Sequence, residues 1–197
     1  MTWTEVAGFV TGALCVWLTV KRNIWNFPIG IANNVFFWVL FIESGLYADA
    51  WLQVVYVVLA GIGWYWWLHG GPQRQALHVR PTPRWAWLAA IVFVASATWL
   101  VYVILTSNTD SAVPLGDALT TALSLGAQIM LNRKWIGNWW LWIVADVIYV
   151  GLYAFKGLYL TSVLYAGFLV LCLVGLRAWR RTLTVPDRSV DAEPVAA

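Results

Sequence analysis

Charged residues are scarce in this chain: only 11% of its 197 residues are Asp, Glu, Lys or Arg, whereas soluble domains contain about a quarter. Residues of the AVILMFWYC set make up 61%, and the mean hydropathy is +0.71. This composition excludes a soluble globular domain. Cysteine is limited to Cys15 and Cys172, each inside an apolar run, which predicts two small buried side chains and no disulfide.

Several functional classes lack the residues that they require. His69 and His78 lie in the same polar segment, so no histidine pair within the membrane can ligate haem. Lys21, Lys134 and Lys156 lie at the ends of apolar runs, which argues against a retinal Schiff base. There is no Gly-rich phosphate loop followed by Lys, no His-Glu-x-x-His and no Gly-x-Ser-x-Gly. We therefore expect no enzyme activity, no cofactor and no bound metal.

Charges and turn residues divide the chain into apolar runs that each have the length of one membrane span, about 17 to 25 residues. The runs cover residues 3–20, 26–42, 50–68, 85–105, 116–131, 138–155 and 158–179. They lack the alternation of apolar and polar residues that is typical of a membrane β-strand. The sequence therefore predicts an all-α membrane protein with about seven transmembrane helices and no separate soluble domain.

The basic residues support this number of helices, because cytoplasmic loops carry an excess of Lys and Arg. With seven spans, one side holds Lys21, Arg22, Arg74, Arg80, Arg84, Arg133, Lys134, Arg177, Arg180, Arg181 and Arg188, and the other holds only Lys156. This sorting places the N-terminus outside and the C-terminus inside a bacterial cytoplasmic (inner) membrane. It also accounts for the pI of about 9.0 without nucleic-acid binding.

The chain repeats itself at an offset of 112 residues. Gly45-Leu46-Tyr47 corresponds to Gly157-Leu158-Tyr159, and the basic pairs Lys21-Arg22 and Arg133-Lys134 coincide. Both copies carry their basic loop on the same side, so they are parallel three-helix bundles and an unpaired fourth helix must join them. The predicted units are a first bundle (1–68), a loop with the linker helix (69–106), a second bundle (107–181) and a disordered cytoplasmic tail (182–197).

Asp146 is the one ionisable residue expected in the middle of a span, where a charge is costly and usually functional. Asn138 and Trp142 share its helix face at a spacing of four residues. Trp139 and Tyr149 lie beside that face.

Other predicted helices carry polar residues that can converge with Asp146 on a cavity. They are Asn34, which corresponds to Asp146 in the repeat, Asp49, Gln53 and Tyr56 in the third helix, and Ser124, Gln128 and Asn132 in the fifth. The alternative for any one of them is a hydrogen bond between helices, worth about 0.6 kcal/mol in membranes. Together they favour a binding cavity.

Tryptophan is abundant, with 16 residues. An interfacial belt explains those at span ends, namely Trp3, Trp66, Trp67, Trp85, Trp87 and Trp179. Trp38 and Trp142 lie deeper. Aromatic faces beside a carboxylate suit a flat cationic ring, and carboxamides suit sugar hydroxyls. The sequence thus indicates a nucleoside-like or heterocyclic ligand.

These motifs, taken in order, resemble the PnuC family of bacterial nicotinamide riboside transporters over roughly residues 5–180. The resemblance rests on Trp25-Asn26-Phe27-Pro28-Ile29-Gly30, Leu46-Tyr47-Ala48-Asp49, Leu52-Gln53, Tyr56, Gly63-Trp64, Ser124 to Gln128, Arg133-Lys134, Asn138-Trp139, Trp142, Asp146 and Leu158-Tyr159. The chain departs from the family pattern at Phe27, where Trp is common, and at Gly137, where an acidic residue often stands.

The resemblance implies a SWEET-like fold, a homotrimer, and facilitated diffusion of nicotinamide riboside with trapping by a cytoplasmic kinase. It implies a binding site formed by Asn138, Trp142, Asp146, Gln53, Asp49 and Gln128. The two bundles would rock about this site, with Pro28 and Gly30 making their helix irregular. Thiamine or another vitamin is an alternative substrate, and a non-transporting seven-helix receptor or structural membrane protein is a distant alternative. Transport coupled to protons through Asp146 is a further alternative, for the mechanism.

Overall fold

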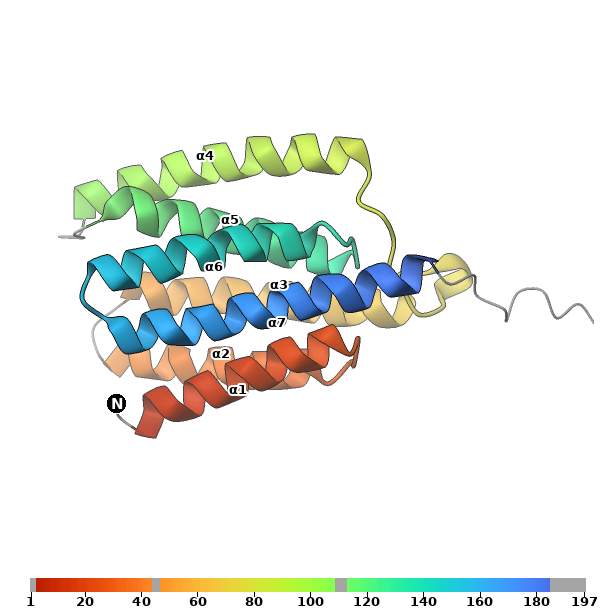
Figure 1. Ribbon diagram of the computed structural model, residues 1–197, viewed down its shortest axis with the longest axis horizontal. Coiled ribbons are helices and arrows are strands. Elements are labelled where there is room, and N and C mark those ends of the chain that lie inside the picture. The colour runs from red at the N-terminus through yellow and green to blue at the C-terminus, as the bar shows by residue number, and fades with distance from the viewer. Residues whose placement is uncertain (1–2, 44–46, 109–112, 185–197) are drawn as a thin grey trace, which may run out of the picture.

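Seven α-helices and one short 3-10 helix form the chain, of which this computed structural model describes residues 3–43, 47–108 and 113–184 (Figure 1). The elements are α1 (Trp3–Val20), α2 (Asn26–Glu43), α3 (Tyr47–His69), η1 (Pro72–Arg74), α4 (Arg84–Asn108), α5 (Pro114–Asn132), α6 (Asn138–Phe155) and α7 (Tyr159–Thr184). Each helix starts within about three residues of a predicted apolar run. The prediction of seven helices is therefore confirmed.

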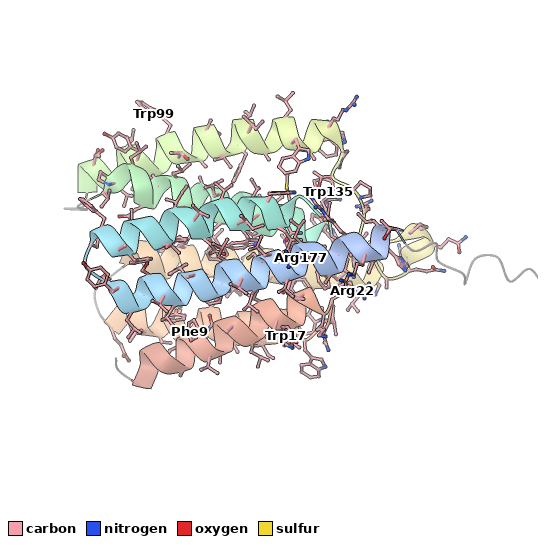
Figure 2. All side chains as sticks on the ribbon, viewed as in Figure 1. Phe9, Trp17, Arg22, Trp99, Trp135 and Arg177 are labelled. Carbon is pink, nitrogen blue, oxygen red and sulfur yellow. The ribbon has the colours of Figure 1, made fainter. Side chains whose placement is uncertain are left out.

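Six of the helices surround a common interior, and α4 lies at one edge. α1 packs on α2 and α2 on α3, while α5 packs on α6 and α6 on α7. Between these two groups, α1 contacts α7 and α3 contacts α5. α4 lies along α5 on the outside of the molecule (Figure 1). Trp99 on α4 is 69% exposed and points away from the other helices (Figure 2).

Five of the described helices, α2, α3, α4, α6 and α7, are long and apolar enough to cross a membrane. α1 has a shorter apolar stretch, Ala7–Val20. α5 is not among these five helices. Because α3, α4 and α6 pack around it, it presents little surface to lipid and can carry more polar residues. Its buried residues include Thr120, Ser124 and Gly126, which are small enough for close helix packing.

Residues that are 112 positions apart have the same local structure where the first and second helices of each group meet. Arg22 follows α1 with φ 58°, and Lys134 follows α5 with φ 50°. Such left-handed residues commonly end helices. The buried carboxamides of Asn26 and Asn138 then each donate to the carbonyl three residues earlier, both at 2.7 Å. These pairs support the repeat that the sequence predicts.

The end of the molecule at which α1, α3, α5 and α7 finish is called here the basic end. Figure 2 shows Arg22 and Arg177 there. Except for Arg188, which lies outside the described residues, the basic residues predicted on one side lie at this end, in the connections, at the start of α4 or near the end of α7. Lys156, at the opposite end, donates to Asp117 at 3.2 Å.

Two predicted details are wrong. Pro28 is the third residue of α2, and the helix is continuous from Asn26 to Glu43, because a proline in the first turn removes no helical hydrogen bond. Pro28 therefore does not make the helix irregular. α7 continues to Thr184, so its last three residues are helical where a tail from residue 182 was predicted. Residues 185–197 lie outside the described residues.

The loop between α3 and α4 (residues 70–83) crosses the turn between α5 and α6. The Arg80 amide donates to the Lys134 carbonyl at 3.1 Å, and the Arg80 carbonyl accepts from the Ile136 amide at 3.1 Å. The Thr82 hydroxyl accepts from the Gly137 amide at 2.7 Å. Since the Leu77 amide of the same loop donates to the Trp67 carbonyl of α3 at 3.0 Å, the loop connects the end of α3 to the start of α6.

Lys134 is a buried cation in this arrangement, with 8% of its surface exposed. Its Nζ donates to the Leu77 carbonyl at 2.6 Å and lies 4.1 Å from the centroid of the Trp67 ring. The ring and the carbonyl favour the charged form. Burial and the nearby Arg22 outweigh them and lower the pKa of Lys134 from about 10.5 to about 8.

This lowered pKa predicts a stability that depends on pH. Between about pH 8 and 10.5 the unfolded chain keeps the Lys134 proton that the folded protein loses, so the free energy of unfolding rises with pH in that window. We expect the melting temperature of the purified protein to rise more between pH 8 and 10 in the wild type than in Lys134→Met. Superimposable pH profiles would show that Lys134 does not titrate in this range.

Candidate ligand-binding cavity

A cavity of about 500 Å³ lies inside the six helices α1–α3 and α5–α7. All six contribute to its described lining, and α4 contributes none of it. Small-molecule sites typically have volumes of about 300 to 1,000 Å³. The cavity is therefore large enough for a nucleoside-sized ligand.

Eight of the ten predicted site residues line this cavity. They are Asn34 on α2, Gln53 and Tyr56 on α3, Gln128 on α5, and Trp139, Trp142, Asp146 and Tyr149 on α6. They come from both copies of the repeat and meet between them.

The two other predicted residues do not belong to the described lining. Asn138 is fully buried, and its carboxamide donates to the Trp135 carbonyl at 2.7 Å at the start of α6. Since Asn26 makes the equivalent bond at the start of α2, the structure gives Asn138 a helix-end role. Asp49 belongs to α3, but its side chain lies outside the described residues.

Asp146 is the acidic residue of the described cavity lining. It is 4% exposed, and its Oδ2 accepts a hydrogen bond from the Cys172 thiol at 3.3 Å. No Lys, Arg or His belongs to the described lining. A buried carboxylate without a cationic partner is costly, so the site is suited to a ligand that brings the positive charge.

Hydroxyl groups form a second polar patch next to Asp146. The hydroxyls of Tyr56, Ser124 and Tyr149 all belong to residues of the described lining. Tyr56 comes from α3 in the first group and the others from α5 and α6. These hydroxyls can donate to or accept from polar groups of a ligand.

Aromatic residues of α7 line the cavity, although no residue of that helix was predicted at the site. Tyr165 packs on Tyr149 with the ring centroids 4.4 Å apart, and on Phe168 at 5.8 Å. The repeat carries the signal that was missed, because an offset of 112 residues maps Gln53 and Tyr56 onto Tyr165 and Phe168.

Asn33 is a further lining residue that the sequence interpretation passed over in favour of Asn34. Its carboxamide nitrogen donates to the Gly8 carbonyl at 3.1 Å and to the Thr11 hydroxyl. It therefore joins α1 to α2 at the cavity wall. The 112-residue offset could not identify it, because its partner in the second half is Ala145.

Four aromatic residues close the cavity at the basic end. Phe27 meets Trp67 edge-on with the centroids 5.0 Å apart, and Trp139 meets Trp179 in the same way at 5.4 Å. Trp67 and Trp179 lie 6.2 Å apart between the two pairs. All four are at most 2% exposed. We call Phe27, Trp67, Trp139 and Trp179 the aromatic floor.

The aromatic floor corrects two sequence interpretations. Trp67 and Trp179 were assigned to an interfacial belt, yet both are in the core. The space comes from glycine: a Cβ on Gly63 would overlap Phe27, and a Cβ on Gly175 would overlap Trp139. Trp38, predicted to lie deeper in its span, is within α2 with 40% of its surface exposed and does not belong to the described lining.

Two hydrogen bonds cross between the helix groups beneath the cavity. The Trp67 indole of α3 donates to the Leu131 carbonyl of α5 at 3.1 Å, and the Trp179 indole of α7 donates to the Thr19 carbonyl of α1 at 3.2 Å. Both donors and both acceptors are 112 residues apart. Each helix group thus donates one indole hydrogen bond to the other group, at equivalent positions of the repeat.

Apolar helices around a buried polar cavity define a multi-pass membrane protein with an internal site for a small molecule. Residues 2–181 match the family described as "Nicotinamide mononucleotide transporter". The chain belongs to this family of membrane transporters and is not an enzyme.

Individual relatives agree with the family. The nicotinamide riboside transporter PnuC of Escherichia coli (strain K12) is 29% identical over 204 residues, covering 91% of this chain and 85% of that protein. The riboflavin/roseoflavin transporter RibM of Streptomyces davaonensis is 23% identical, covering 90% and 84%. The crystal structure of the vitamin B3 transporter PnuC has the same fold, with a TM-score of 0.69 at 24% identity over 91% of this chain and 81% of that one.

Proposed function

We propose that this protein carries nicotinamide riboside, the unphosphorylated vitamin, into bacterial cells by facilitated diffusion. The observation that carries the proposal is the buried Asp146 carboxylate, in a cavity whose described lining has no Lys, Arg or His. Nicotinamide riboside has a positively charged pyridinium ring, a carboxamide and ribose hydroxyls. The cavity offers a counter-charge, aromatic faces and carboxamides to these groups.

The same observation distinguishes the riboside from the mononucleotide. The family description names nicotinamide mononucleotide, whereas the PnuC relatives are named for the riboside. A phosphate monoester carries about −1.5 to −2 charges at pH 7 and would lie in a closed site that already holds a carboxylate. With no cation in the described lining to pair with it, the phosphate would cost free energy, so the cavity favours the riboside.

Three lining residues have the chemistry to position the ligand. Trp142 offers an indole face to the pyridinium ring, and Gln53 and Gln128 offer carboxamides to the ribose and the nicotinamide amide group. They lie on α6, α3 and α5, so the ligand would touch both helix groups. Asn138, first expected to share this role, is used at the start of α6.

Replacing the indole tests the stacking role. We expect Trp142→Ala to weaken nicotinamide riboside binding about fivefold or more, because a lost cation–π contact costs about 1 kcal/mol or more. Isothermal titration of the purified variant measures this, and Trp140→Ala is the matched control because Trp140 lies on the exposed side of the same helix. A dissociation constant within twofold of the wild type would exclude stacking on Trp142.

The transport cycle follows from the two helix groups. α1–α3 and α5–α7 would act as two bundles joined by α4, which rock about the cavity and open it to either side in turn. The positive-inside rule places the basic end in the cytoplasm and the N-terminus outside. In the structure the aromatic floor closes the basic end, so release into the cell requires these four residues to separate.

The family resemblance completes the proposal. The protein would work as a homotrimer in the inner membrane, in contact with the lipid bilayer, and a cytoplasmic nicotinamide riboside kinase would trap the vitamin as its phosphate. Its substrate is a small molecule, and it binds no nucleic acid. The kinase is needed because facilitated diffusion cannot concentrate a substrate on its own.

Other substrates share part of this chemistry. Thiamine is also a cationic aromatic vitamin and could use Asp146 and Trp142. Riboflavin, which appears in the name of the relative RibM, is uncharged and cannot form a charge pair with Asp146. Proton coupling is disfavoured, because the repeat places the non-titrating Asn34 opposite Asp146. A receptor or structural protein would not need a polar cavity that both bundles line.

Uptake into proteoliposomes tests the proposal. Labelled nicotinamide riboside should enter vesicles containing the protein with saturable kinetics and reach the outside concentration but not exceed it. An imposed pH gradient should not change the rate. Excess thiamine should compete less than unlabelled riboside. No uptake above empty vesicles, or accumulation driven by the pH gradient, would contradict the proposed function.

A further inference from the structure

A chain of hydrogen bonds leads from the cavity to the contact between the two bundles. Gln128 lines the cavity, and its Nε2 donates to the Asn132 Oδ1 at 3.1 Å, one turn further along α5. The Asn132 Nδ2 then donates to the Leu59 carbonyl of α3 at 2.8 Å. Asn132 is 1% exposed and does not belong to the described cavity lining. We infer that Asn132 is a positioning residue that makes the α3–α5 contact respond to the ligand.

The other contact between the bundles lacks this connection. The α3–α5 and α7–α1 contacts are equivalent under the 112-residue repeat and share the crossed indole bonds. The repeat maps Gln128 and Asn132 onto Val16 and Val20. Val16 also lines the cavity and Val20 is buried, but neither side chain can form a hydrogen bond. Within the described residues, only the α3–α5 contact therefore has a hydrogen-bond chain that starts at a polar side chain of the lining and crosses to the other bundle.

The bonding capacity of the carboxamides explains how a ligand acts on this contact. Gln128 has one acceptor oxygen and two N–H donors, and one donor is used by Asn132. A ligand that binds Gln128 fixes the orientation of its amide. Asn132 must follow, since a buried amide left without partners costs about 1 to 3 kcal/mol. The bond from Asn132 to Leu59 changes with it, so the α3–α5 contact loosens before the α7–α1 contact.

Gly63 provides the space for Asn132 from the opposite side. A Cβ at Gly63 on α3 would overlap the Asn132 carboxamide. The contact can therefore be broken from either bundle, by Asn132→Val or by Gly63→Ala, and neither residue belongs to the described cavity lining. Asn132→Val gives α5 the residue that α1 has at the equivalent position.

The inference rests on the proposed function, and its test separates binding from transport. In Asn132→Val we expect the dissociation constant for nicotinamide riboside to stay within threefold of the wild type, while the maximal uptake rate falls at least fivefold. Gly63→Ala should lower the uptake rate at least fivefold as well, but its Cβ would also overlap Phe27 of the aromatic floor, so this variant is used for the uptake rate alone. Val20→Ala is the matched control at the other contact, and both quantities should stay within twofold. A role in packing alone would instead affect Val20→Ala as much as the other two variants.

Hydrogen exchange supplies a readout that does not depend on a variant folding. In the wild type, the riboside should change the exchange of backbone amides at the ends of α3 and α5 more than at the end of α1, and Asn132→Val should remove this difference. Equal changes at both contacts, or an unaltered uptake rate in Asn132→Val, would overturn the inference and leave the proposed function standing. Absence of riboside uptake by the wild type would overturn the proposed function itself.

Discussion

Asp146→Asn is expected to weaken nicotinamide riboside binding at least thirtyfold while leaving the protein folded. The substitution keeps the shape of the side chain and an oxygen that can accept from the Cys172 thiol. It removes the charge that we propose faces the pyridinium ring. Truncating one partner of a buried charge pair costs about 2 to 5 kcal/mol, and 2 kcal/mol corresponds to about thirtyfold in affinity. Isothermal titration of the purified variant measures the change.

Two controls make this result specific for charge. The reduced dihydronicotinamide riboside has an uncharged ring, so its affinity should change less than threefold on the same substitution. Asp117→Asn removes another carboxylate, which is partly exposed and paired with Lys156 outside the cavity, and should leave riboside binding within twofold. If Asp146→Asn weakened binding of both ring forms equally, Asp146 would act through hydrogen bonding or packing and not through its charge.

Trp67→Ala and Trp179→Ala are expected to open the cavity at the basic end. Each removes a fully buried indole with its edge-on and tilted ring contacts and one of the two crossed hydrogen bonds. Loss of a buried tryptophan typically costs about 3 to 5 kcal/mol. Cys172 lines the cavity and is 4% exposed, so in a Cys15→Ser background its reaction with an impermeant maleimide reports access. Labelling from the side of the basic end should accelerate at least tenfold.

The side from which the labelling of Cys172 accelerates shows which end of the cavity has opened. Vesicles of opposite orientation distinguish the two sides, and Trp85→Ala is the control because Trp85, near the basic end, is 64% exposed. Trp179→Phe keeps a ring but loses the bond to Thr19, so its labelling rate should be intermediate. Faster labelling from the opposite side, or no change, would show that the aromatic floor does not close the pathway.

The helices could be predicted because in lipid the sequence marks their ends directly. Charged residues are excluded from the apolar interior, so Lys21 and Arg133 follow α1 and α5 closely. The repeat could be predicted for a related reason, since each half needs the same basic turn. Most of the predicted cavity residues could also be identified from the sequence, because residues such as Asp146 and Gln128 would be costly facing lipid and must point inward.

The direction of a side chain at the end of a span could not be predicted. Trp66 and Trp67 are neighbours at the same depth, yet the Arg133 guanidinium lies 3.8 Å from the centroid of the Trp66 ring, while Trp67 is 2% exposed in the core. Position along the span gives depth only. Whether the core has room for these rings depends on Gly63 and Gly175, where a Cβ would overlap Phe27 and Trp139, and such packing between distant parts of the chain leaves no local pattern.

The role of a buried carboxamide could not be predicted from the sequence either. Asn138, Asn132 and Gln128 are all amides on predicted inward faces, but they serve a helix end, a contact between bundles and the cavity wall, respectively. An amide can satisfy itself on a nearby backbone carbonyl as readily as on a ligand. Only the positions of the neighbouring carbonyls, which depend on how the helices pack, decide between these roles.

We propose that the cavity binds the cationic, unphosphorylated vitamin because the Asp146 carboxylate offers it a counter-charge. Isothermal titration of the wild-type protein with nicotinamide riboside and with its 5′-phosphate, under identical conditions, tests it most directly. We expect saturable binding of the riboside and an affinity for the phosphate at least a hundredfold weaker. Equal or tighter binding of the phosphate would contradict it.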